Sequence, residues 1–145
     1  MVCLGNICRS PLAEGILKSK LSNSFIVDSA GTANYHTGNS PDKRSIAVAR
    51  KYGLDISNLT GRQFSVSDFD SFDLIYVMDE SNYKNVVKLA RNNDDVKKVK
   101  MILNEVYPNQ NYDVPDPYYG GDDGFENVYK MLDEACEIIA QDLDK

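Results

Sequence analysis

The chain has 145 residues, the size of one ordinary domain and enough to bury a substantial core. Hydrophobic residues make up 42% and charged residues 26%, as in soluble globular proteins. No apolar run approaches the roughly 18 residues of a membrane span, and no signal segment is visible. The net charge of −6 argues against nucleic acid, whose partners gather Lys and Arg. We therefore expect one cytoplasmic domain, residues 1–145, that binds neither membrane nor nucleic acid.

The three cysteines cannot all pair, so they do not form a disulfide framework. Cys3 and Cys8 lie five residues apart, with no further Cys or His at metal-ligand spacing, so we expect no metal site. Cys136 falls on the apolar face of a predicted helix and is interpreted as a core side chain.

Residues 3–10 read Cys-Leu-Gly-Asn-Ile-Cys-Arg-Ser and run into Pro11, a pattern that predicts a loop followed at once by a helix. Pro fits the first position of a helix, and Ser10 before it is a good N-cap. The amides of such a loop and the helix dipole favour a bound anion. Gly5 permits close backbone approach, and the Asn6 side chain can bridge and stiffen the loop. The loop is therefore predicted to bind phosphate.

The same loop contains a nucleophile and a cation. Near a helix N-terminus and an Arg, the pKa of a cysteine falls to roughly 3.5–7.5, so Cys3 is predicted to attack as a thiolate. Arg9 offers a fork of donors that suits two phosphate oxygens. The Cys-x5-Arg spacing alone is unspecific, but Gly, Asn, Ser and Pro also stand where such a loop needs them.

Only Met1 and Val2 precede this loop, whereas a phosphate loop normally leaves the end of a parallel strand. We expect the first strand to be truncated at Met1, with further apolar residues before it in the native protein. Periodicity and turn residues predict the later elements: a helix over 11–22, a strand over 25–27, a helix from Asp42 to Gly53, a strand over 73–78, a helix capped by Asp79, a strand over 99–103 and a helix over 124–143. Strands that alternate with helices imply a parallel sheet covered on both faces.

The segments between these elements are predicted to be irregular. Residues 54–72 are polar, with a short edge segment at Arg62–Phe64, and residues 92–95 break the pattern. Residues 31–41 form a loop, in which His36 is assigned no role and Tyr35 matters if the loop folds over the site.

A thiolate that attacks a phosphate ester needs an acid for the departing oxygen, which raises the rate about 10²- to 10⁴-fold. Residues 113–121 read Asp-Val-Pro-Asp-Pro-Tyr-Tyr-Gly-Gly, with prolines that stiffen the loop and glycines that let it turn. Asp116 stands between the prolines and is predicted to be this acid. Tyr118 and Tyr119 are predicted to wall a slot for an aromatic ring. By itself the segment also fits a plain surface turn.

Residues 2–11 and 116–119 together resemble the low-molecular-weight protein tyrosine phosphatases, and the similarity extends over nearly the whole chain. Residues 28–32, 62–63 and 78–82 also resemble that family. The resemblance implies an α/β three-layer sandwich: a central four-stranded parallel sheet flanked by helices, with the phosphate loop at the first strand–helix junction. It also implies hydrolysis of phosphotyrosine in protein substrates through a cysteinyl-phosphate. We expect a mainly monomeric enzyme without a cofactor, because thiolate, Arg and Asp cover attack, charge and proton transfer.

The resemblance implies roles for individual residues. Cys3 attacks phosphorus, Arg9 and the amides of residues 4–9 hold the equatorial oxygens, and Asp116 protonates the phenolic oxygen and later deprotonates water. The remaining residues bind phosphate, support the loop or line the ring slot: Leu4, Gly5, Asn6, Ile7, Cys8, Ser10 and Ser29 for the first two tasks, and Leu4, Tyr35, Tyr118 and Tyr119 for the slot.

Two positions qualify the resemblance. Many members have a His shortly before the Arg-Gln pair that contacts the loop Asn, whereas this chain has Asn58 and Leu59 there, so the support of Asn6 by this segment is in question. Cys8 matches a second loop cysteine that in the family forms a disulfide with the nucleophile and protects it from over-oxidation. A small packed side chain is the alternative interpretation of Cys8.

Three other functions compete with this one. An arsenate reductase needs further downstream cysteines, and only Cys136 is present. A protein-arginine phosphatase remains an alternative, although related enzymes have Thr where this chain has Ile7, whose branched side chain suits a flat ring better than a guanidinium. A non-catalytic phosphotyrosine-binding relic is the other alternative, although such a relic is expected to lack Cys3 or Asp116.

Overall fold

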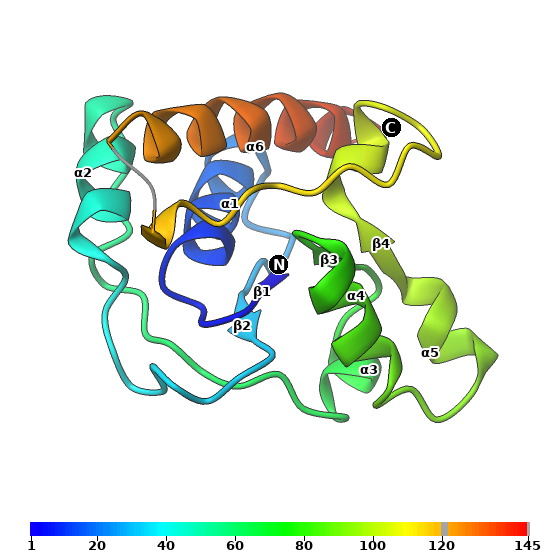
Figure 1. The fold of residues 1–145 in the computed structure, drawn as a ribbon. Helices are drawn as coiled ribbons and strands as arrows, with labels where there is room; N and C mark the ends of the chain where they lie inside the picture. The colour runs from blue at the N-terminus through cyan, green and yellow to red at the C-terminus, as the bar shows by residue number, and fades with distance from the viewer. Residues whose placement is uncertain (120–121, 145) are drawn as a thin grey trace.

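Four short parallel strands form the centre of the protein, which a computed structural model describes for residues 1–119 and 122–144, apart from the side chains of Tyr119 and Asp122. The strands are β1 (Val2–Cys3), β2 (Ala30–Gly31), β3 (Ile75–Val77) and β4 (Val99–Met101). Their order is β2-β1-β3-β4 (Figure 1), so the short β1 lies inside the sheet. The four-stranded parallel sheet is confirmed.

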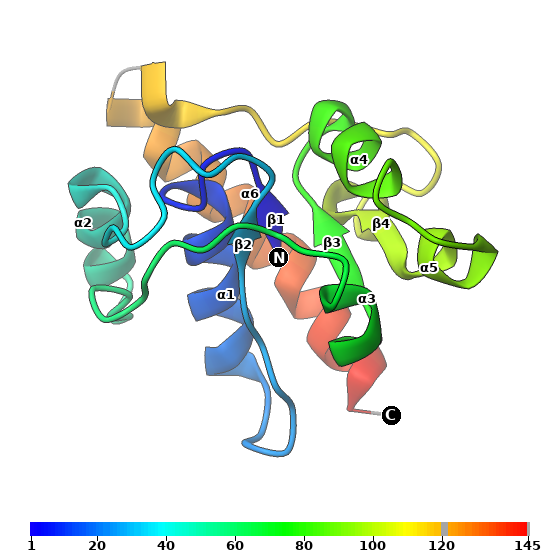
Figure 2. The same ribbon diagram turned by 90° about the horizontal axis from the view of Figure 1, so that it is seen from below.

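Helices cover both faces of the sheet (Figure 2). The helices on one face are α1 (Arg9–Lys20), α2 (Lys43–Lys51) and α6 (Asp122–Leu143). Those on the other face are α3 (Asp68–Ser71), α4 (Glu80–Val87) and α5 (Asn93–Lys98). Two short 3-10 helices, η1 (Ile102–Glu105) and η2 (Pro117–Tyr119), follow β4 and precede α6. The three-layer arrangement is confirmed, with α1 and α6 packed along each other.

Alternate residues of the central strands enter two separate hydrophobic cores. Ile75 and Val77 pack in the core shared with α3 and α4, whereas Tyr76 and the following Met78 pack in the core shared with α1 and α6. Successive side chains of a strand point to opposite faces, which is why this segment is apolar at every position. Cys3 faces the α1 side, so its sulfur lies on the side of the sheet where the following loop turns into α1.

The predicted start of the first helix is wrong. The helix begins at Arg9, with Cys8 as its N-cap residue and no side-chain cap, so Pro11 is the third helical residue. Ser10 therefore is not the N-cap. Its buried hydroxyl accepts a hydrogen bond from the Asn6 side chain and lies 3.0 Å from the Cys3 sulfur. A local propensity for capping is overridden by these contacts within the loop.

The predicted strand over 25–27 is also wrong, because that segment has no regular structure and Ile26 is 84% exposed. The strand forms instead at Ala30–Gly31. A Cβ on Gly31 would lie 2.8 Å from the carbonyl oxygen of Leu4. The small residues that reduce strand propensity are therefore the ones that allow this strand to approach the phosphate loop closely.

Other local predictions have mixed outcomes. Asp42 and Asp79 cap α2 and α4 as expected, and Gly53 follows α2 with a φ of +81°. The edge segment at Arg62–Phe64 consists of one bridge from Gln63 to Gly31. The short helices α3 and α5 were not predicted, and the expected break over 92–95 contains the start of α5.

The core predicts a sharp contrast between two isoleucines. Ile16 on α1 is 1% exposed, whereas Ile26 is 84% exposed. We expect Ile16→Ala to lower the free energy of unfolding by about 2–5 kcal/mol, and Ile26→Ala to change it by less than about 0.5 kcal/mol. Urea unfolding monitored by circular dichroism measures both; equal losses would contradict the assignment of the α1 face to the core.

Candidate active site

The loop between β1 and α1 closes around the sulfur of Cys3. The amide of Asn6 donates to Sγ at 3.3 Å, and the Ser10 hydroxyl lies 3.0 Å away. Asn6 has a φ of +57°, in the left-handed region that Asn tolerates better than most residues. The reversal at Asn6 therefore turns the chain back so that its backbone N–H meets the sulfur.

The Asn6 side chain fixes this reversal with three hydrogen bonds. Its Nδ2 donates to Ser10 Oγ at 2.8 Å and to Ser29 Oγ at 3.0 Å, and its Oδ1 accepts from the Arg62 amide at 3.0 Å. Asn6 is 3% exposed, so each of these bonds is made away from water. The question about the segment containing Leu59 is thereby answered: the segment supports Asn6 through the main chain of Arg62.

Glu14 completes this network and was missed in the sequence. Ser29 Oγ donates to Glu14 Oε1 at 2.6 Å, and Glu14 is only 2% exposed. Because Ser29 gives its hydrogen to this carboxylate, its oxygen is left to accept from Asn6. The available signal was a single acidic residue one helical turn after Ser10, within an otherwise apolar helix face.

The hydroxyl of Ser10 is oriented in the same way, by a hydrogen bond that its oxygen accepts. Its oxygen accepts from Asn6, so its own hydrogen is available for the Cys3 sulfur at 3.0 Å, with the Ala30 carbonyl oxygen more distant at 3.5 Å. A hydroxyl donor at this position stabilises a thiolate more than a thiol, because hydrogen bonds to charged groups are the stronger ones.

Arg9 is buried, with only 2% of its surface exposed, and its guanidinium has fixed partners. Its Nη1 donates to Asp79 Oδ2 at 2.7 Å and to the Val114 carbonyl at 2.9 Å, and its Nη2 lies 3.6 Å from Asp116 Oδ2. Burial acts to lower the pKa of Arg9, but the opposing charges of Cys3, Asp79 and Asp116 raise it above its ordinary value. Arg9 therefore stays a cation, and its Nη2 is directed towards Asp116.

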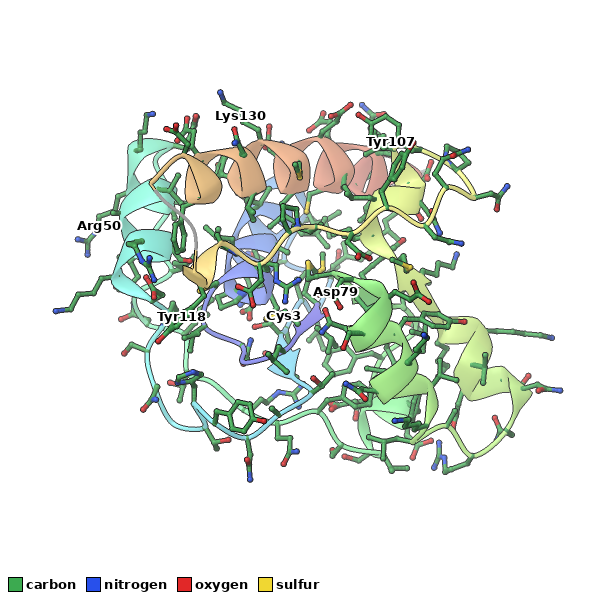
Figure 3. The ribbon with its side chains drawn as sticks, in the orientation of Figure 1. Cys3, Arg50, Asp79, Tyr107, Tyr118 and Lys130 are labelled. Atoms are coloured by element: carbon green, nitrogen blue, oxygen red, sulfur yellow. The ribbon has the colours of Figure 1, made fainter. Side chains whose placement is uncertain are left out.

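Asp79 has a second function that the sequence did not indicate. Its Oδ1 accepts from the Asn82 amide and caps α4, while its Oδ2 binds Arg9. Asp79 lies two residues after the end of β3, and residues at the carboxyl ends of neighbouring parallel strands lie at one edge of the sheet. Figure 3 shows Asp79 close to Cys3, which is the last residue of the adjacent β1.

The segment that carries Asp116 is anchored beside β3. The Val114 amide donates to the Met78 carbonyl at 2.8 Å, and the Glu80 amide donates to Asp113 Oδ1 at 2.9 Å. Asp116 itself is partly exposed, and its Oδ1 accepts from the Tyr118 amide at 3.0 Å. The structure thus brings Cys3, Arg9 and Asp116 together, as the sequence predicted.

These three residues open into one cavity of about 250 Å³. The side chains expected at the ring slot stand around it: Leu4 is 39%, Tyr118 38% and Tyr35 74% exposed. The other lining residues are Gly5, Ile7, Cys8 and His36. Asn6, Ser10 and Ser29 lie behind this wall and support it. The predicted contributions of the Tyr119 side chain and of Gly120 and Gly121 lie outside the described residues.

His36 corrects a prediction, because it was assigned no role and lines this cavity. Its ring centre lies 6.4 Å from that of Tyr118, and a Cβ on Gly5 would meet its Cδ2 at 3.0 Å. The loop over 31–41 does fold over the site: the Ala33 amide donates to the Leu4 carbonyl at 2.9 Å.

A larger cavity of about 310 Å³ lies at the amino-terminal end of the strands, beside Met1 and Val2. It contains none of Cys3, Arg9 and Asp116. The chemistry therefore belongs to the smaller cavity, at the carboxyl ends of the strands, where ligands of open parallel sheets bind.

The three cysteines are free and buried, but their surroundings differ. Burial, reinforced by the charges of Asp42, Cys3 and Asp116, raises the pKa of Cys8 to about 12. Burial in the core against α1 raises the pKa of Cys136 to about 12. Neither is therefore an effective nucleophile near neutral pH. A hydrogen bond from Ser45 acts to lower the pKa of Cys8, but burial outweighs it. The sulfur of Cys3 has both a hydroxyl, that of Ser10, and a backbone amide, that of Asn6, directed at it.

Membrane-spanning helices and metal clusters are both absent from the part of the chain that the structure describes. Over residues 1–119 and 122–144, no helix combines the length and the apolar character needed to cross a membrane. Over the same residues, no three His, Cys, Asp or Glu side chains are grouped so that they would hold a metal ion.

A thiol in a loop of backbone amides, a buried arginine and a partly exposed carboxyl at the edge of a parallel sheet define the cysteine-dependent phosphatases as a class. The family model described as "Low molecular weight phosphotyrosine protein phosphatase" matches residues 1–145. The chain belongs to this family.

Individual proteins give the same result. The low molecular weight phosphotyrosine protein phosphatase of Mus musculus is 40% identical over 148 residues, covering 97% of this chain and 91% of its own. A protein tyrosine phosphatase structure from Entamoeba histolytica superposes with a TM-score of 0.90 at 37% identity, covering 99% of this chain and 94% of that one. Wzb of Vibrio vulnificus, solved in complex with benzylphosphonate, has a TM-score of 0.88 at 30% identity and covers 97% and 94% of the two chains.

The cysteine environments predict selective alkylation. At pH 8, a thiol with a pKa of about 12 has roughly one thiolate in ten thousand molecules. We expect iodoacetamide to modify Cys3 in the folded protein and to leave Cys8 and Cys136 unmodified until urea unfolds the chain. Peptide mapping by mass spectrometry measures this, and inorganic phosphate added as a competitor is expected to protect Cys3. Modification of Cys8 at a rate equal to that of Cys3 would contradict the assignment.

Proposed function

We propose that this protein hydrolyses phosphotyrosine in protein substrates, with Cys3 as nucleophile, Arg9 as phosphate ligand and Asp116 as general acid and base. One observation carries the proposal: Cys3 and Arg9 of the N-terminal loop and Asp116 from a segment far along the chain line one cavity, and together they cover attack, charge and proton transfer. Membership of the phosphotyrosine phosphatase family supports the assignment.

In the first step, the Cys3 thiolate attacks phosphorus, the S–P bond forms and the bond from phosphorus to the phenolic oxygen breaks. Asp116 transfers its proton to that oxygen, so the leaving group departs as a neutral phenol. Arg9 and the loop amides bind the equatorial oxygens, whose charge is stabilised by donors that are already in place. Asp79 keeps the guanidinium there through its 2.7 Å bond.

In the second step, Asp116 accepts a proton from water, whose oxygen attacks the cysteinyl-phosphate. The S–P bond breaks, inorganic phosphate leaves and the thiolate of Cys3 is restored. Ser10 assists this step, because its hydroxyl, 3.0 Å from the sulfur, stabilises the departing thiolate. No electron transfer or external reagent other than water is required.

The shape of the cavity supports an aryl phosphate. Leu4, Tyr35 and Tyr118 surround its opening with apolar surface, and Ile7 adds a branched side chain at its wall. Benzylphosphonate, with which the V. vulnificus protein was solved, pairs a ring with a phosphonate in the same way. Phosphoarginine lacks the ring that would use these walls, and a binding relic would not need both Cys3 and Asp116.

Three finer properties accompany the proposal. Free thiols at Cys3, Cys8 and Cys136 suit a reducing compartment such as the cytoplasm. We also propose that Cys3 and Cys8, both lining the cavity, form a reversible disulfide on oxidation. The enzyme is proposed to act mainly as a monomer.

A panel of metal-free assays tests the function. We expect fast turnover of phosphotyrosine peptides, and at most about 1% of that rate for phosphoserine and phosphoarginine peptides of matched sequence. Cys3→Ser is expected to abolish turnover and to retain binding of the phosphotyrosine peptide by calorimetry. A preference for phosphoarginine would show that the assigned substrate is wrong. Residual turnover by Cys3→Ser would show that Cys3 is not the nucleophile.

The role of Asp116 predicts a dependence on the leaving group. We expect Asp116→Asn to slow phenyl phosphate about 10²- to 10⁴-fold, because phenol requires protonation as it leaves. With p-nitrophenyl phosphate, whose leaving group is a stabler anion, the loss is expected to be at least tenfold smaller. Steady-state kcat on the two substrates measures the difference; equal losses would exclude Asp116 as the acid.

A further inference from the structure

The start of α2 is joined to the phosphate loop. The Asp42 amide donates to the Ile7 carbonyl at 2.8 Å, and Ser45 Oγ donates to the Cys8 carbonyl at 3.4 Å. Ser45 is fully buried. The N-terminal turn of α2 is therefore fixed to the loop that surrounds Cys3.

Arg44 extends from this turn to the loop that carries Asp116. Its Nε donates to Asp42 Oδ1 and its Nη2 to Asp42 Oδ2, both at 3.1 Å, so the guanidinium is held by a two-point contact. The same Nη2 donates to the Tyr118 carbonyl at 3.1 Å. The guanidinium also lies 4.6 Å from the ring centre of Phe125 and 5.5 Å from that of Tyr118.

The main chain of Tyr118 links Arg44 to Asp116. Its carbonyl accepts from Arg44, and its amide donates to Asp116 Oδ1 at 3.0 Å, which leaves Oδ2 directed towards Arg9 at 3.6 Å. A continuous series of hydrogen bonds thus runs from the phosphate loop through Asp42, Arg44 and Tyr118 to the carboxyl group.

We propose that Arg44, oriented by Asp42, is a positioning residue that ties the loop bearing the general acid to the phosphate loop. The inference rests on the proposed function, because it assigns to Arg44 the placement of Asp116 over the leaving oxygen. Anchors at Asp113 and Val114 hold the loop before Asp116, and Arg44 holds it after Asp116. A proton transfer depends steeply on this distance, so a loosened loop weakens the acid without altering the nucleophile.

Charge supports the same arrangement. Burial acts to raise the pKa of Asp42, but hydrogen bonds from the side chain and amide of Arg44 hold it below its ordinary value. Asp42 is therefore a carboxylate under assay conditions and keeps Arg44 in place across the working pH range.

The test compares two arginines on the same helix. Arg44→Met keeps a long side chain at this position and removes the donors, while Arg50→Met changes an exposed arginine near the end of α2 (Figure 3). We expect Arg44→Met to lower kcat for phenyl phosphate at least tenfold and kcat for p-nitrophenyl phosphate less than about twofold, with KM for both within about twofold. Arg50→Met is expected to match the wild type.

A double variant shows whether Arg44 acts through Asp116. In the Asp116→Asn background, Arg44→Met is expected to cause less than about a twofold further loss, since the group that it positions is gone. Arg44→Lys keeps the charge but not the fork, so we expect the same leaving-group dependence at a smaller size. It also serves if thermal unfolding shows that the Met variant is unstable.

Several results would overturn the proposal. Equal losses on the two substrates would indicate a general structural effect, and a change confined to KM would make Arg44 a substrate-binding residue. A full further loss in the Asp116→Asn background would make the two residues independent. Failure of the proposed catalytic chemistry is distinct, because the wild-type protein would then turn over neither substrate, whereas a preference for phosphoarginine would show only in the assays of phosphopeptides.

Discussion

The arrangement of the site depends on the side-chain amide of Asn6. Each of its two hydrogens and its oxygen is engaged, by Ser10, Ser29 and the main chain of Arg62. These contacts hold Asn6 in the left-handed region, which few residues other than Gly adopt and which Asn tolerates. Because the turn directs the Asn6 N–H at the sulfur, the backbone of the loop, the hydroxyl of Ser10 and the sulfur of Cys3 are all placed around one buried amide.

The site also depends on the sheet, which brings segments that are distant in the sequence close together. β1 lies between β2 and β3, so residues in and next to these strands meet around the loop without long connections. Ser29 and Gly31 support it from the β2 side, and Asp79 does so from the β3 side. Asp116 joins them only because Val114 continues the same edge through its bond to Met78. The parallel order of the strands thus brings Arg9 into contact with Val114, which is 105 residues away in the sequence.

Much of this was predictable because the strongest signals are local. The Cys-x5-Arg loop, Asp116 between two prolines and the caps at Asp42 and Asp79 depend on residues adjacent in the chain. The wrong predictions concern positions where tertiary contacts decide. Ser10 has the propensity of an N-cap but is engaged by Asn6, and Gly31 looks like a turn residue but forms a strand because the loop packs against it.

The residues that the sequence analysis missed are likewise ones whose roles depend on tertiary contacts. Glu14, Arg44 and the second contact of Asp79 are recognisable only when segments from different elements are placed together. His36 stands in a polar loop whose position over Gly5 no local pattern reveals. Neither hydrophobic periodicity nor turn chemistry contains such information, since both describe neighbours along the chain.

The division of the Asp79 carboxylate between two partners has a consequence for motion. One oxygen holds the first turn of α4 and the other holds Arg9, so the two segments share a single rigid joint. Opening of the first turn of α4 would release the carboxylate and, with it, the guanidinium that we propose as the phosphate ligand. With Arg9 as the proposed ligand, the affinity for an oxyanion and the resistance of that turn to amide hydrogen exchange are thermodynamically linked: an oxyanion that binds the Arg9 held by Asp79 also slows the opening of the end of α4.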